Sequence, residues 1–321
     1  MTRKDVLLFE ADFRKRFLLL NKELRKLEKR LLIIVRQSIK GAKLSTIYWN
    51  RIKIEVTKLY AEMGALFISW SEKNIPWRYK KSLVLMGKRI ANTQYIANMA
   101  SKGLRKLATS RYSLTIMRGL YDDAVQSYLS GLNLGKKNLF TLFRNTQQML
   151  YDEALININV TAGFEMGNLR QAKTMLTELF KTSEWLIVDN KQFIQAGKMR
   201  YKPHYYAELV ARTKFHQAHS QAALAQGANY GTDLMQVSSH NTTTKICMDF
   251  EGKIFSMSGK DKRFPPLTDS PPYHPNCLHL IFPTFESAMQ VQGTLESFSA
   301  FSKGNISTPP LPPSFIPIGN R

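Results

Sequence analysis

The C-terminal fold is decided by HNTTTKICMDFEGKIF at residues 240–255, together with PPYHPNCLHLIFP at residues 271–283. These two segments contain both cysteines of the chain and three of its six histidines. Short apolar runs in and beside them predict three strands, at residues 234–238, 253–257 and 278–283. The polar, proline-rich loop at residues 259–275 is too long for a tight hairpin, so we expect other contacts to pin it.

Cysteine and histidine occur here in a pattern that suits a metal ion. Alternate residues of a strand face the same way, so Cys277 and His279 can present a thiolate and an imidazole to one point. Cys247, with either His240 or His274, can complete a tetrahedral set of the mixed kind that zinc accepts. The candidate ligands of a structural zinc site are therefore Cys247, Cys277, His279, His240 and His274. The alternative is that the cysteines are buried apolar side chains and the histidines make ordinary hydrogen bonds.

Three other chemistries fit these residues less well. A disulfide between the two cysteines is disfavoured in a reducing cytoplasm. A thiol enzyme needs a base oriented toward the thiol, and a neighbour two residues along a strand is poorly placed for that. An HNH-like nuclease built from His240-Asn241 and His274-Pro275-Asn276 needs a ββα unit, which the sequence pattern does not indicate. We therefore predict no enzymatic activity and no catalytic residues.

Residues 1–202 are predicted to be a basic helical region. Apolar side chains recur there every three or four residues in two stripes, Phe13, Phe17, Leu20, Leu24, Leu27, Leu31 and Ile34, then Ile52, Val56, Leu59, Met63, Leu66 and Trp70. A break at residues 41–45 separates them, which predicts a helical hairpin at residues 8–72. The hairpin either packs within its own domain, mediates self-association as a coiled coil, or lies along DNA. Residues 74–77 and the glycines of residues 131–135 are expected to interrupt later helices.

A small module and a tail are predicted to follow. Lys202-Pro203 opens a helix that is expected to reach about residue 228, and with the three strands it forms an α+β module at residues 203–286. Residues 287–321 are predicted to form a helix and then an extended proline-rich tail. The predicted fold class is mainly α, with an elongated helical N-terminal part and a small α+β C-terminal module.

The charge of the chain is large and unevenly placed. The formal net charge is +22, from 46 basic and 24 acidic residues. Residues 233–321 carry seven of each sign, which leaves 39 basic and 17 acidic residues in residues 1–232. Such an excess predicts attraction to a polyanion, and without a base-reading motif the contacts are independent of nucleotide sequence. The candidate DNA-contacting residues are Arg25, Lys26, Lys29, Arg30, Lys80, Lys81, Lys88, Arg89, Arg105 and Lys106.

Export and membrane insertion are not predicted. The N-terminus lacks a long apolar run before a small-residue cleavage site, and two cysteines are too few for a secreted disulfide scaffold. The longest aliphatic run, residues 31–35, is far shorter than the ~20 residues that span a bilayer. We expect a protein made and folded in the cytoplasm, with no membrane span.

An ordered series of motifs in residues 205–283 carries a family resemblance. It consists of Ala211-Arg212-Thr213 in a helix, residues 227–231, Val237-Ser238-Ser239-His240, Cys247, residues 251–256 and residues 271–279. As a series, covering about the last third of the chain, it resembles the Mu-F-type head morphogenesis and phage minor capsid protein families. Many members have Cys-x-x-Cys at the first cysteine and Cys-x-Cys at the last. Phe250 and His279 stand at those second positions here, and the histidine keeps a ligand type.

The resemblance implies a minor structural protein of a tailed-phage head. Its expected partners are the portal protein or the major capsid protein, at the head interior, and packaged double-stranded DNA. Its expected role is in head morphogenesis or DNA ejection, after assembly in the host cytoplasm. The charge split agrees, since a neutral module can dock on protein while a basic module faces DNA. The alternative is a DNA-binding or DNA-processing protein unrelated to capsids.

Overall fold

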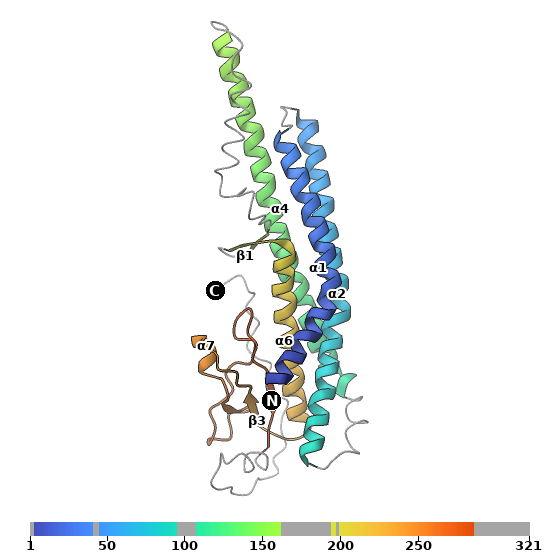
Figure 1. The fold of residues 1–321 in the computed structure, drawn as a ribbon, viewed down its shortest axis with the longest axis vertical. Coiled ribbons are helices and arrows are strands. Elements are labelled where there is room, and N and C mark those ends of the chain that lie inside the picture. Colours follow the sequence, from blue (N-terminus) through green and yellow to red (C-terminus); the bar gives the residue numbers. More distant parts are fainter. Residues whose placement is uncertain (1–2, 41–44, 95–106, 162–193, 197–198, 286–321) are drawn as a thin grey trace. The chain divides into compact units, whose positions relative to one another are not determined.

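The computed structural model describes residues 3–40, 45–94, 107–161, 194–196 and 199–285. Its elements in chain order (Figure 1) are α1 (Arg3–Lys40), α2 (Thr46–Gln94), α4 (Arg111–Thr161), β1 (Ile194–Ala196), β2 (Met199–Tyr201), α6 (Pro203–Asn229), β3 (Leu234–Val237), α7 (Lys245–Met248), β4 (Ile254–Ser256) and β5 (Ile281–Pro283). The predicted fold class is confirmed, because long helices make up the N-terminal part and the α+β elements follow. None of the helices within these residues is long and apolar enough to cross a membrane.

The stripe predicted for the first helix is the buried face of α1. Six of its seven members are buried: Phe13, Phe17, Leu20, Leu24, Leu27 and Leu31. α1 and α2 lie side by side in Figure 1, and the Tyr48 hydroxyl at the start of α2 donates to the Ser38 carbonyl near the end of α1 at 3.0 Å. α1 ends at Lys40 and α2 begins at Thr46. Of the break predicted at residues 41–45, residues 41–44 lie outside the described residues, as do the predicted helix and tail of residues 287–321.

The predicted break at residues 74–77 is wrong, because α2 continues through Pro76. Proline removes one helical hydrogen bond, and tertiary contacts on either side compensate for it. Ile75 and Tyr79 are fully buried, and the Arg16 guanidinium lies over the Trp77 ring at 3.2 Å from its centroid. Burial of this face of α2 therefore outweighs the helix-breaking tendency of Pro76.

The glycines of residues 131–135 do not interrupt α4 either. Gly131 is needed for close packing rather than for a turn. A Cβ atom at this position would lie 2.6 Å from Cε1 of Tyr206 and 2.9 Å from Cγ2 of Ile194. Gly119, on the same helix, has no neighbour within 4 Å of such an atom.

The described residues form two compact units, and α1, α2, α4 and α6 each contribute a segment to both. The first unit comprises residues 3–17, 70–94, 107–124 and 209–285, and the second comprises residues 18–40, 45–69, 125–161, 194–196 and 199–208. In the second unit, β1 and β2 pair antiparallel, and the rings of Phe67 and Tyr128 lie 4.3 Å apart. The sheet and the cysteines belong to the first unit.

The sheet of the first unit has the antiparallel order β4-β3-β5, with Leu234 opposite Ser256 and Val237 opposite Ile281. All three predicted strands are present, each shorter than predicted. The apolar faces of β3 and β5 share a buried cluster with Ala223 and Leu224 of α6. The sheet therefore packs directly on the C-terminal half of α6.

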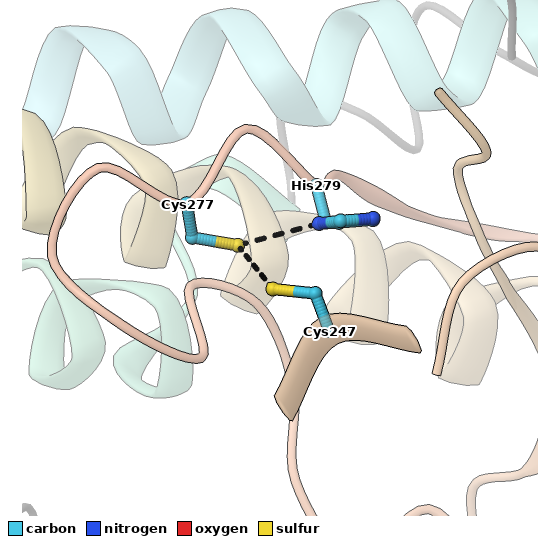
Figure 2. Close-up of side chains that lie close together, drawn as sticks. All are labelled: Cys247, Cys277 and His279. Carbon is cyan, nitrogen blue, oxygen red and sulfur yellow. Dashed lines mark hydrogen bonds between the residues drawn. The ribbon is translucent and has the colours of Figure 1, made fainter. Parts of the chain in front are cut away.

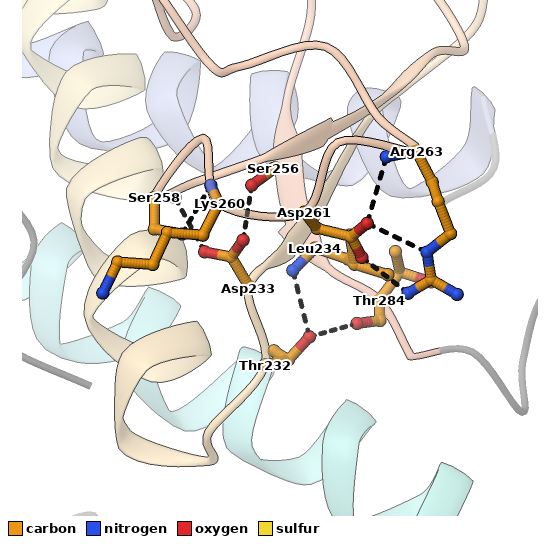
Figure 3. A network of polar contacts seen from close by, with 9 residues as sticks. All are labelled: Thr232, Asp233, Leu234, Ser256, Ser258, Lys260, Asp261, Arg263 and Thr284. Atoms are coloured by element: carbon orange, nitrogen blue, oxygen red, sulfur yellow. Dashed lines mark hydrogen bonds and ion pairs between the residues drawn. The ribbon is translucent and has the colours of Figure 1, made fainter. Parts of the chain in front are cut away.

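The loop at residues 259–275 is pinned at several points, as predicted. The Ser256 N–H donates to the Pro265 carbonyl, and the Leu267 N–H donates to the Ser256 carbonyl. Figure 3 shows that Asp233 accepts hydrogen bonds from the Ser256 hydroxyl and the Ser258 N–H. Further along the loop, the Ser220 hydroxyl of α6 donates to the Pro271 carbonyl at 2.6 Å.

Six polar side chains of α6 meet partners from other parts of the first unit. The contacts are Arg212 and His216 with Glu10, Lys214 with Asp123, His219 with Arg78 and Ser82, Ser220 with the Pro271 carbonyl, and Gln226 with the Leu83 carbonyl. Arg78 can only donate, so Nδ1 of His219 accepts its hydrogen bond and the imidazole is neutral. Apart from Arg212 and Pro271, which belong to the motifs at residues 211–213 and 271–279, these residues carried no signal in the sequence.

Adding a methyl group at Gly131 should destabilise the protein, whereas adding one at Gly119 should not. Gly131→Ala forces Tyr206 or Ile194 to move, which should lower the free energy of unfolding by about 1–3 kcal/mol. Gly119→Ala, an exposed helical position, should be neutral or raise it by up to about 1 kcal/mol. Urea unfolding of both variants tests this pair, and equal effects would contradict the close packing at Gly131.

Acidification should destabilise the protein through His219. Burial holds the pKa of His219 well below 6.5, and the nearby positive charges of Arg78, His216 and Arg89 lower it further. The unfolded chain takes up this proton as the pH falls below about 6.5 and the folded chain does not, so the free energy of unfolding falls with pH. The slope of the free energy of unfolding against pH therefore contains a contribution from His219. His219→Gln should remove it and lower the slope between about pH 6 and pH 5 by about 1.4 kcal/mol per pH unit, which corresponds to one proton.

Urea unfolding across this pH range measures the slope. Ser82→Ala is the matched control, since it removes a hydrogen-bond partner of His219 and leaves the titrating group in place. The control should lower stability at every pH without changing the slope. A His219→Gln slope equal to that of the unaltered protein would contradict the assignment.

Candidate functional site

The structure brings together four side chains that we call the Cys/His cluster: Cys247, His274, Cys277 and His279. Cys247 lies in α7, and the other three lie in the segment that leads into β5. The two sulfur atoms are 4.0 Å apart, and Sγ of Cys277 is 3.6 Å from Nδ1 of His279 (Figure 2). Nε2 of His274 lies 3.1 Å from Sγ of Cys247. Both thiols are free and buried.

Local turns position these side chains. The N–H groups of Cys247 and Met248 both donate to the Thr244 carbonyl, which forms the single turn of α7. In the other segment, the Cys277 N–H donates to the His274 carbonyl at 3.0 Å, and Asn276 has φ of 74°. Asparagine is among the residues that tolerate this left-handed conformation. The tight turn places His274 and Cys277 on the same side, facing α7.

A second group of donor atoms adjoins the first through His279. His240, Glu251 and His279 lie with one donor atom each within 4.8 Å of one another. Nε2 of His279 is 3.7 Å from Oε1 of Glu251, and the rings of His240 and His279 are 4.2 Å apart. Glu251 also accepts hydrogen bonds from the backbone N–H groups of His240 and Thr242. Its carboxylate therefore joins the turn after β3 to the cluster.

The protonation states of the cluster follow from its burial. Burial raises the pKa of the Cys247 thiol to about 12, with the adjacent Cys277 adding to the rise, and burial also raises the pKa of Cys277. Burial, followed by the proximity of His240, lowers the pKa of His279 to about 4. Without a bound cation both thiols are protonated at neutral pH, and a nucleophilic enzyme needs the thiolate. This argues against the thiol-enzyme alternative.

Glu251 borders the Cys/His cluster, and the sequence analysis missed its contact with His279. It was noted as part of a motif, and its spacing from the cysteines gave no sign of that contact. Phe250, at the position where many members of the resembled families have a second cysteine, stacks on Tyr273 with ring centroids 4.2 Å apart. It contributes packing and no donor atom.

The candidate DNA-contacting residues have different surroundings. Arg25, Lys26, Lys29 and Arg30 are exposed on α1, and Lys80 and Lys88 are exposed on α2. Lys81 pairs with Asp12 and Arg89 lies over the Phe282 ring, so these two also make internal contacts. Arg105 and Lys106 lie outside the described residues. The four residues on α1 are spaced so that they share one face of that helix.

Comparison with known protein families identifies the relatives of this chain. The family model for phage minor capsid protein 2 matches residues 24–301. Neither the curated proteins nor the solved structures include a match to the chain. The family match extends well beyond the last third in which the resemblance was identified, and it takes in α1 from residue 24 onward, all of α2 and all of α4. The chain therefore belongs to the phage minor capsid protein 2 family.

Proposed function

We propose that this minor capsid protein docks on the portal or the capsid interior through its C-terminal module and contacts packaged DNA through its basic helices. The observation that carries the proposal is the separation of charge along the chain. Residues 1–232 hold 39 basic and 17 acidic residues, and residues 233–321 hold seven of each. A surface that docks on protein needs no excess of positive charge, whereas a surface that contacts DNA does.

The exposed basic face of α1 supports the DNA part of the proposal. Arg25, Lys26, Lys29 and Arg30 are exposed to solvent. The ion pairs of Lys26 with Glu23 and of Arg30 with Glu62 lie on the surface. Exposed ion pairs of this kind contribute only about 0–1 kcal/mol, so they give way readily to phosphate contacts. Contacts of this type position a protein on DNA without reading its sequence.

The docking part rests on the family membership and the C-terminal module. Head morphogenesis requires a protein to attach before or during DNA packaging, and a module held rigid by pinned loops and buried contacts is suited to this. The enzymatic alternative has weaker support, since the thiols of the cluster are buried and protonated. The function that follows is structural, in head assembly or DNA ejection.

DNA binding should be independent of sequence and should weaken steeply with salt. We compare two variants of the full-length protein, each of which removes four positive charges. The first carries Arg25→Gln, Lys26→Gln, Lys29→Gln and Arg30→Gln. The second carries Lys245→Gln, Lys253→Gln, Lys260→Gln and Lys262→Gln. The first should reduce the slope of log affinity against log salt by up to about 3–4, since each phosphate that is no longer neutralised accounts for about 0.9. The second, in the neutral part, should leave the slope nearly unchanged.

Titrations of duplex DNA at several salt concentrations measure both slopes. Equal reductions would mean that only net charge matters, and they would remove α1 from the proposed interface. A flat salt response of the unaltered protein would contradict DNA contact altogether.

Portal docking makes a separate prediction about assembly. The protein should sediment with procapsids that contain the portal and should be missing from procapsids assembled without it. Quantitative mass spectrometry of both kinds of particle measures its copy number relative to the major capsid protein. Equal amounts in both particles would place the docking surface on the capsid shell.

A further inference from the structure

We propose that Cys247, His274, Cys277 and His279 bind one structural zinc ion. This goes beyond the proposed function, because it concerns how the C-terminal module is held together and does not depend on what that module docks on. It also makes a choice that the sequence left open, since it takes His274, and not His240, as the fourth ligand.

The spacing of the donor atoms fits a tetrahedral ion. Zn–S bonds of about 2.3 Å and Zn–N bonds of about 2.0–2.1 Å put two sulfur ligands about 3.8 Å apart and a sulfur and a nitrogen about 3.5 Å apart. The sulfur atoms of Cys247 and Cys277 are 4.0 Å apart, and Sγ of Cys277 is 3.6 Å from Nδ1 of His279. These three donors all lie within 4.8 Å of one another.

His274 supplies the fourth donor from the open side of the cluster. Its Nε2 atom is already 3.1 Å from Sγ of Cys247, and its side chain is only half-buried. The His274 donor atoms are not among those that all lie within 4.8 Å of one another, so its ring has to turn to complete the tetrahedral set, and its partial exposure permits that movement. Its other nitrogen, Nδ1, lies 3.2 Å from the Pro275 carbonyl oxygen, which can hold the proton on that atom.

A carboxylate lies behind His279, on the side where a histidine ligand commonly has an outer partner. While Nδ1 faces the sulfur of Cys277, Nε2 lies 3.7 Å from the Glu251 carboxylate. A carboxylate behind a ligating imidazole fixes the ring and raises its basicity. Glu251 is itself held by the backbone N–H groups of His240 and Thr242, which fixes the position of its carboxylate behind His279.

His240 belongs to a different arrangement. Its ring packs against His279, and the donor group that it forms with Glu251 and His279 contains no thiol. Two thiolates and two imidazoles are a set typical of zinc, whereas the group around His240 lacks the sulfur ligands. Phe250 meanwhile occupies the position of a second cysteine with an apolar ring stacked on Tyr273.

Such an ion would join α7 to the segment before β5. It would cross-link Cys247 to residues 274–279, and so fasten the far end of the loop at residues 259–275. The strands here are three or four residues long, so a metal cross-link would stabilise a sheet that has few backbone hydrogen bonds of its own.

The experiment measures zinc in the full-length protein, purified under reducing conditions without chelator, by elemental analysis and native mass spectrometry. We expect one equivalent in the unaltered protein and in His240→Asn. His274→Asn should bind zinc at least about tenfold more weakly, and Glu251→Gln about 10–100-fold more weakly. Removing zinc with a chelator should lower the thermal midpoint by more than about 5 °C and zinc should restore it.

Cobalt substitution identifies the ligands without relying on stability. Co²⁺ alone is added to the apo protein, and two thiolates should give a sulfur-to-metal charge-transfer band whose intensity is halved in Cys247→Ser and in Cys277→Ser. His274→Asn should change the visible bands and keep the charge-transfer intensity. Because the His274 side chain is half-exposed, this variant separates metal binding from misfolding.

Several results would overturn the proposal. They are less than about half an equivalent of zinc in the unaltered protein, a disulfide between Cys247 and Cys277, a His240→Asn variant that loses zinc, or a His274→Asn variant that keeps full affinity. Failure here would leave the DNA-binding slopes of the α1 variants untouched, so the two proposals are tested separately.

Discussion

The burial of α6 is the constraint on which the first unit depends. Its alanines at positions 211, 218, 222 and 223 are fully buried, so neighbouring elements approach the helix closely on several faces. The same length of helix carries Arg212, Lys214, His216 and His219. Buried polar groups cost free energy unless they are paired, so each must find a partner as the helix packs. The partners come from α1, α2 and α4, which fixes where these elements meet α6.

The position of the sheet follows from the same helix. Ala223 and Leu224 share a buried cluster with Met235, Cys247 and Ile281, so the small residues of α6 allow the sheet and the cysteines to pack against it. The hydrogen bond from Ser220 to the Pro271 carbonyl then ties the long loop to α6 just before His274. Packing on α6 therefore helps to position both cysteines of the Cys/His cluster.

Local chemistry made part of this fold predictable. Pro203 and the apolar runs between turn residues predicted α6 and the three strands, because these signals act over a few residues. The passage of α2 through Pro76 was not predictable, because burial of Ile75 and Tyr79 outweighs the missing hydrogen bond. The Glu10–His216 contact joins residues 206 positions apart. The contact between His274 and Cys247 likewise depends on a turn whose direction cannot be read from the spacing of the residues.

The buried contacts also change what the net charge means. Of the 46 basic residues, Arg78, Arg212 and Lys214 are directed inward and paired with acidic groups of the first unit, so they contribute little to the field outside. Attraction to DNA depends on charges that can reach phosphate without breaking such pairs. Among the candidates within the described residues, Arg25, Lys26, Lys29 and Arg30 meet that condition on one face of α1, and Lys80 and Lys88 meet it on α2. The formal charge therefore overstates the basic surface, and the exposed face of α1 is the better measure of it.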